Sequence, residues 1–144
     1  MAAVYKIVFA GVGAAGKTEA IRTLSDHDVL STEASGTGNA ESGTGSGAVV
    51  ALDYGVVTLD NGDRLHLYGT SGRDGADFMC GIVTQGSMGM VILVDGSAAD
   101  PVGDLRACVA AFRTVVNQTR LVVGLTRVAA TDRTIRPAIA EALR

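Results

Sequence analysis

The stretch Gly11-Val12-Gly13-Ala14-Ala15-Gly16-Lys17-Thr18 matches the pattern G-x-x-x-x-G-K-[ST] and stands between segments that predict two different elements. Residues 4–9 form a short apolar run that predicts a strand. The sequence from Lys17 to about Leu24 predicts a helix with Ile21 and Leu24 on its buried side. In such a loop, consecutive backbone N–H groups point at one phosphate, with the positive end of the helix dipole behind them. The pattern therefore predicts a phosphate-binding loop at the end of the first strand.

The residue types in this stretch fit particular roles at a chain of phosphates. The Lys17 ammonium would reach the outer phosphates, and the Thr18 hydroxyl would ligate Mg²⁺. Small residues let the backbone approach the phosphates closely. The backbone contacts are expected from Gly11, Gly13, Ala14, Ala15 and Gly16. The alternative interpretation is a tight strand-to-helix turn with an exposed lysine.

Composition narrows the class of protein further. The 144 residues suffice for one domain, with 47% hydrophobic and 19% charged residues. A net charge of −3 provides no basic field for a nucleic-acid backbone, so DNA and RNA are not expected partners. Cys80 and Cys108 are too few for a disulfide framework and are interpreted as small buried residues. Without a secretory leader pattern or an apolar run near the ~20 residues that span a bilayer, we expect a cytoplasmic protein without a transmembrane segment.

Short apolar runs alternate with amphipathic stretches, a pattern typical of an α/β fold with parallel strands and crossover helices. Asn61-Gly62 separates the apolar runs 49–59 and 64–68, which predicts an antiparallel hairpin. Residues 31–47 are mostly Gly, Ser and Thr and predict a mobile loop. Further buried strands are expected at 89–95 and 121–125, with helices at 77–83, from Pro101 through Leu105, Val109, Phe112 and Val116, and from Pro137 to Arg144.

Three further motifs follow the phosphate-binding loop in order: Ala51-Leu52-Asp53-Tyr54-Gly55, Leu65-His66-Leu67-Tyr68-Gly69-Thr70-Ser71-Gly72 and Asp77-Phe78-Met79. With these motifs, nearly the whole chain resembles a bacterial branch of the Ras-like small GTPases, of the conservon type. The resemblance implies a P-loop NTPase fold with a mostly parallel sheet and helices on both faces. It also implies a GTP/GDP switch in cytoplasmic signalling, with Mg²⁺ as cofactor and a Roadblock-type regulatory protein as partner.

The chain departs from that family in the first loop that responds to the γ-phosphate. Where the family has a threonine that contacts Mg²⁺, this chain reads Gly47-Ala48-Val49. Thr44 or Ser46 would replace that threonine only if the loop were shifted by a few residues. In the second loop, Gly69 stands where most Ras-like proteins have a metal-linked aspartate, a replacement that the bacterial branch also shows.

The second loop also differs at the positions that orient the attacking water. Ser71 and Arg73 stand where the family has a proline and a glutamine, and Gly72 between them is expected at the nucleotide. Arginine has only donors, so it cannot accept a hydrogen bond from the water as glutamine does. Arg73 would instead act as an internal arginine finger that neutralises phosphate charge. The alternative is a solvent-exposed loop arginine.

The strand that reads the base in the family ends here in Leu125-Thr126-Arg127-Val128-Ala129. The resemblance places Thr126 and Arg127 at the nucleotide, but Ala129 occupies the position of the carboxylate that accepts both guanine N–H donors. Asp132 is the nearest substitute, so the motif does not fix a preference for guanine over adenine. The sequence stops at Arg144, before the last strand and helix of the family fold. We therefore expect either a truncated relative or an edge completed by a partner.

Two other acidic residues are candidates to hold Mg²⁺ through water. Asp53 lies inside a hairpin strand, and Asp95 lies at the carboxyl end of a predicted central strand. Because ligands bind outside the carboxyl ends of strands in open α/β sheets, Asp95 is preferred. The alternative for either residue is a cap of backbone N–H groups at the strand end. His27 and His66 have no acidic neighbours at ligand spacing and are interpreted as structural.

Three functions are consistent with these features. The first is a GTP-binding molecular switch with slow or no hydrolysis, which works through a regulatory partner. The second is a catalytically inert P-loop interaction module, which the missing switch threonine, glutamine and guanine acid favour and the intact Gly16-Lys17-Thr18 opposes. The third is an adenine-nucleotide-binding ATPase or kinase, although no arginine-rich lid segment follows the loop.

Overall fold

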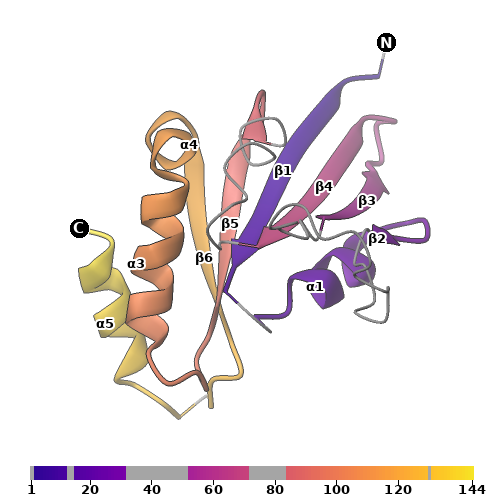
Figure 1. Ribbon diagram of the computed structural model, residues 1–144. Helices are drawn as coiled ribbons and strands as arrows, with labels where there is room; N and C mark the ends of the chain where they lie inside the picture. The colour runs from indigo at the N-terminus through magenta and orange to yellow at the C-terminus, as the bar shows by residue number, and fades with distance from the viewer. Residues whose placement is uncertain (1, 13–14, 32–51, 72–83, 130) are drawn as a thin grey trace, which may run out of the picture.

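The computed structural model places six strands in one sheet and describes residues 2–12, 15–31, 52–71, 84–129 and 131–144 (Figure 1). The strands follow one another across the sheet in the order β2-β3-β4-β1-β5-β6. Their bounds are β1 Val4–Gly11, β2 Leu30–Ser31, β3 Leu52–Thr58, β4 Arg64–Ser71, β5 Gly89–Asp95 and β6 Arg120–Thr126.

Most of the sheet is parallel. β1 pairs in parallel with β4 and β5, and β5 pairs in parallel with β6. β3 runs antiparallel to both of its neighbours, β2 and β4. The predicted hairpin is confirmed: Thr58 is opposite Arg64, and Gly62 takes a φ of 89° in the turn between them. The α/β class predicted from the sequence is therefore confirmed.

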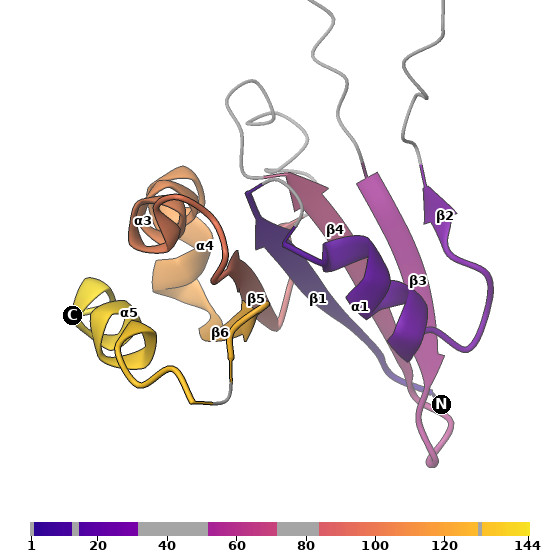
Figure 2. The ribbon, with the colours of Figure 1, turned by 90° about the horizontal axis from the view of Figure 1, so that it is seen from below.

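Helices cover both faces of the sheet, as predicted. Their bounds are α1 Lys17–Leu24, α3 Pro101–Ala111, α4 Arg113–Gln118 and α5 Ile135–Ala142. Figure 2 shows α1 on one face and α3, α4 and α5 on the other. In the part of the chain that the structure describes, no helix is both long and apolar enough to cross a membrane.

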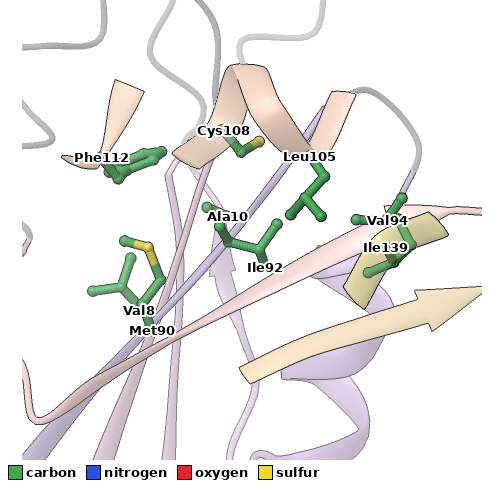
Figure 3. Packing of buried hydrophobic residues seen from close by; sticks show 9 residues of the cluster. All are labelled: Val8, Ala10, Met90, Ile92, Val94, Leu105, Cys108, Phe112 and Ile139. Atoms are coloured by element: carbon green, nitrogen blue, oxygen red, sulfur yellow. The ribbon is translucent and has the colours of Figure 1, made fainter. Parts of the chain in front are cut away.

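Alternate residues of the central strands supply two separate cores, because successive side chains of a strand point to opposite faces. On the face of α1, Phe9 and Leu93 pack with Ile21, which is fully buried. On the opposite face, side chains from β1 and β5 meet α3 and α5 (Figure 3). These residues are Val8, Ala10, Met90, Ile92, Val94, Leu105, Cys108, Phe112 and Ile139. The two cores fix the carboxyl ends of β1 and β5 firmly in place.

Four expectations about the elements are wrong in detail. Leu24 is 50% exposed rather than buried, because α1 ends there and the chain leaves it in an extended conformation at Ser25. The strand over 121–125 has no fully buried residue, because β6 is the last strand in the sheet order.

The other two concern helices. The predicted single helix from Pro101 divides into α3 and α4, because Phe112 leaves helical geometry while its ring stays in the core. α5 begins at Ile135, two residues before Pro137. Proline is accommodated there because the first turn of a helix needs no intrahelical N–H partner. The predicted loop 31–47, apart from Ser31 in β2, and the predicted helix 77–83 lie outside the described residues.

Candidate functional site

The carboxyl end of β1 and the amino end of α1 flank the glycine-rich motif of residues 11–18, the predicted phosphate-binding loop, in the strand-to-helix context that the sequence predicts. Gly11 has no room for a side chain, because a Cβ there would lie 2.5 Å from the Leu93 carbonyl oxygen. Gly16 precedes α1 with a φ of 95°, a left-handed conformation that favours glycine. Gly16 offers no side-chain cap, so no side chain at this position competes with a ligand for the backbone N–H groups at the start of α1.

Lys17 lies folded across this loop. Its Nζ donates a hydrogen bond to the carbonyl oxygen of Gly11 at 2.6 Å. A phosphate oxygen is a charged acceptor and would bind the ammonium more strongly than this neutral carbonyl. The lysine therefore already lies at the loop that would bind the phosphates, as the motif requires.

Thr18 contacts an acidic side chain from another strand. Its Oγ1 donates a hydrogen bond to Oδ2 of Asp53, in β3, at 2.6 Å. Asp53 is only 6% exposed, and its Oδ1 is buried without a hydrogen-bond partner among the described residues. A buried carboxylate oxygen without a partner is costly unless a cation or donor satisfies it. Thr18 and Asp53 together therefore form an oxygen-rich pair beside the phosphate-binding loop.

The hairpin register explains why Asp53 reaches this position. Asp53 is directly opposite Gly69 of β4, so both residues face α1. A Cβ at Gly69 would lie 2.7 Å from Cδ1 of Ile21 and 3.4 Å from the Asp53 Cβ. Gly69 thus leaves space both for the buried Ile21 and for the carboxylate of the neighbouring strand.

Thr126 ties the loop to the centre of the sheet. Its Oγ1 contacts the carbonyl oxygens of Ala15 at 3.0 Å and Val94 at 3.3 Å, so one hydroxyl bridges the loop and β5. The Thr126 carbonyl accepts a hydrogen bond from the Gly96 N–H at 2.7 Å. Thr126 was expected at the nucleotide through its place in the base-reading strand. The structure gives it a positioning contact on the phosphate-binding loop.

Asp95, the acid preferred from the sequence, is engaged with its own neighbours. Its Oδ1 accepts hydrogen bonds from the backbone N–H and the hydroxyl of Ser97, at 2.9 and 2.6 Å. Its Oδ2 lies 3.4 Å from Nη1 of Arg127, which is 59% exposed. The Ser97 hydrogen bonds and the Arg127 charge lower the pKa of Asp95 by more than desolvation raises it. These contacts match the alternative of a strand-end cap.

Asp132, the substitute considered for base reading, accepts hydrogen bonds from the residues at the start of α5. Its Oδ1 accepts hydrogen bonds from the N–H and hydroxyl of Thr134 at 2.9 and 2.8 Å, which lower the pKa of Asp132. The Ile135 N–H also points to it, at 3.4 Å. Ala129 is exposed and brings no acceptor to the same loop.

The remaining candidates divide into two groups. His66 lies with Nδ1 3.1 Å from the Tyr54 hydroxyl, and Cys108 is buried in the core, where desolvation raises its pKa to about 11. Both residues fit the structural roles expected of them. The other predicted positions lie outside the residues whose side chains the structure describes: Gly13, Ala14, Thr44, Ser46, Ala48, Ser71, Gly72, Arg73 and Cys80.

No protein-family model and no curated protein matches this chain. Within the described ranges, no three His, Cys, Asp or Glu side chains gather as a metal-binding group. A metal ion at Thr18 and Asp53 would therefore need further oxygens from a ligand or from water. Mg²⁺ sites that use one or two protein groups together with substrate phosphates have this character.

Proposed function

We propose that this protein is a small-GTPase-like P-loop switch that binds GTP and GDP with Mg²⁺ and hydrolyses GTP slowly or not at all. The contact between Thr18 and Asp53 at the phosphate-binding loop carries the proposal. It supplies an oxygen pair beside the lysine and the helix amino terminus that the phosphate-binding motif brings together. A tight turn with an exposed lysine gives no reason for the buried, half-satisfied carboxylate.

The two side chains suit Mg²⁺ in different ways. The Thr18 hydroxyl donates its one hydrogen bond to Asp53 and keeps lone pairs that can ligate a metal. The free Oδ1 of Asp53 would hold the ion through a water molecule or directly. The bound ion would neutralise charge on the outer phosphates and on the buried carboxylate together.

Discrimination between purine bases is proposed to be weak. A carboxylate that accepts two N–H groups distinguishes guanine from adenine, but position 129 is alanine. Asp132 already accepts hydrogen bonds from Thr134 at the start of α5. The base site is therefore expected to recognise shape and stacking more than the guanine edge.

Slow hydrolysis and a regulatory partner belong to the same proposal. Arg73 and Ala48 replace the groups that orient water and hold the metal in the family that the sequence resembles. A cytoplasmic signalling role with a Roadblock-type regulator follows from that resemblance. The absence of these groups and of a guanine-reading carboxylate at position 129 favours a second candidate, an inert P-loop interaction module.

Titration calorimetry with GDP and ADP, each with and without Mg²⁺, separates the two candidates. We expect wild type to bind in a Mg²⁺-dependent way and Lys17→Ala to show no measurable binding, because the variant loses the main positive charge of the loop. Arg22→Ala, an exposed site on the same helix, is the matched control and should bind like wild type. Wild type that binds neither nucleotide would support the inert module instead.

A further inference from the structure

β6 leaves one long side without a partner strand in the described part of the chain. It pairs with β5 on one side and ends the strand order on the other. Its sequence, Arg-Leu-Val-Val-Gly-Leu-Thr, has no proline and no charge between its first residue and its end. Proteins usually protect exposed edge strands with such residues, because free N–H and C=O groups recruit further strands. The β6 edge lacks that protection.

Apolar side chains border this edge on both faces of the sheet. On the face of α5, a groove of about 450 Å³ is lined by Val123, Leu125, Arg136, Ile139, Ala140 and Leu143, here called the β6–α5 groove. On the face of α1, Val122 is 61% exposed opposite Val91 of β5. A strand added to β6 would place alternate side chains against each of these surfaces.

The segment from β6 to Arg144 is positively charged. Residues 120–144 carry five arginines and two acidic residues, a formal charge of +3, while the whole chain carries −3. Residues 1–119 therefore carry −6. Arg136 lines the β6–α5 groove, and Arg120 begins β6; both are exposed and form no ion pair within the described ranges. Arg127, at the other end of β6, lies beside Asp95.

We infer that β6 and the β6–α5 groove form a docking surface for an extended acidic segment of a partner protein. The segment adds to the sheet as a further strand, with its apolar residues against Val122 and the groove. Its carboxylates meet Arg120 and Arg136. Pairing of two copies through β6 is disfavoured, because the like-charged arginines of both chains would be brought together.

The test uses a fluorescent seven-residue peptide, the length of β6, with glutamates at both ends and Val-Ile-Val in the middle. Fluorescence anisotropy should show saturable binding to wild type that weakens with added salt. Arg120→Glu combined with Arg136→Glu should weaken binding by about tenfold or more. Arg106→Glu combined with Arg113→Glu changes the net charge equally at exposed helix sites and should bind like wild type. Circular dichroism checks that both double variants are folded.

Probe variants test the backbone pairing without altering the protein. The same peptide with N-methyl groups along one edge should lose binding, because it cannot pair with β6. A peptide with lysines in place of glutamates should bind at least about tenfold more weakly.

Equal binding of the acidic, lysine and N-methylated peptides, or no binding of any, would overturn the inference. So would phosphatidylserine vesicles that bind wild type and lose binding in Arg120→Glu/Arg136→Glu, since the surface would then serve a membrane. A concentration-dependent dimer in sedimentation that the same variant abolishes would assign the edge to a second copy and equally contradict the inference.

Discussion

Replacement of Asp53 by asparagine isolates the charge that we assign to the metal site. Asparagine keeps the size of the side chain and an oxygen to accept from Thr18. Without ligand, we expect the variant to be as stable as wild type or more stable, because the buried, unpartnered Oδ1 carries a desolvation cost. With Mg²⁺ and GDP, we expect about 10–100-fold weaker binding, the usual effect of removing a group that supports a metal ligand.

The loss of affinity produces a measurable change in the ligand-induced shift of Tm. At a GDP concentration of ~100 times the wild-type Kd, ligand stabilises wild type by about 2.7 kcal/mol. A variant with ~100-fold weaker affinity gains only about 0.4 kcal/mol under the same conditions. For a domain of this size, the difference lowers the ligand-induced shift in Tm by roughly 5–10 °C.

Differential scanning fluorimetry with and without Mg²⁺ measures this shift directly. Asp60→Asn, at an exposed position in the hairpin turn, is the matched control and should keep the wild-type shift. Retention of the full Mg²⁺-dependent shift by Asp53→Asn would show that Asp53 does not hold the ion. An equal loss of the shift in Asp60→Asn would show the same.

The base site, the hydrolysis step and the buried thiol each allow a separate measurement. In competition binding, wild type should prefer GDP to ADP by far less than the ~10⁴-fold that hydrogen-bond matching allows. Ala129→Asp should raise this preference for GDP. Strong selectivity in wild type would show that other groups read the base. The rate of single-turnover phosphate release should be at or below the ~10⁻⁴ s⁻¹ scale of unassisted small GTPases. The double variant Arg73→Gln/Ala48→Thr should raise this rate by more than the sum of the two single changes. Fast turnover in wild type would instead make Arg73 a catalytic charge stabiliser. With Cys80 replaced by serine, Cys108 should resist a thiol reagent until the protein unfolds, because burial raises its pKa from 9.0 to about 11. The folded state keeps this thiol protonated, so its contribution to stability is complete below pH 9.0 and declines as pH rises toward about 11; rapid labelling of folded protein would contradict the assignment.

The sequence was sufficient to predict the elements that local chemistry determines. The strand Gly89–Asp95 and the helix Lys17–Leu24 were predicted with their observed bounds, because an apolar run and a phosphate-loop pattern mark them. The hairpin followed from Asn61-Gly62. The strand Arg120–Thr126 was predicted to be buried, because an apolar composition does not reveal how much of the last strand of a sheet is exposed.

The position of Asp53 could have been predicted from the sequence, but the rule that ligands bind at strand ends favoured Asp95 instead. Ligands collect at the carboxyl ends of parallel strands, which led to Asp95. Counting outward from the turn at Asn61 pairs residue 58 with 64 and 53 with 69, which puts Asp53 opposite Gly69 and on the face of α1. The contacts of Thr126 with Ala15 and Val94 gave no comparable signal, because they join segments far apart in the sequence.

The nucleotide content of the purified protein is the sharpest test of whether this chain binds purine nucleotides. Protein purified in Mg²⁺ is denatured, and the released small molecules are separated by ion-exchange chromatography, with Lys17→Ala purified in parallel. We expect wild type to release purine nucleoside di- or triphosphate in near-stoichiometric amount and Lys17→Ala to release almost none. Wild type that releases no nucleotide and takes up neither GDP nor ADP on addition of Mg²⁺ would show that the protein is not a nucleotide-binding switch.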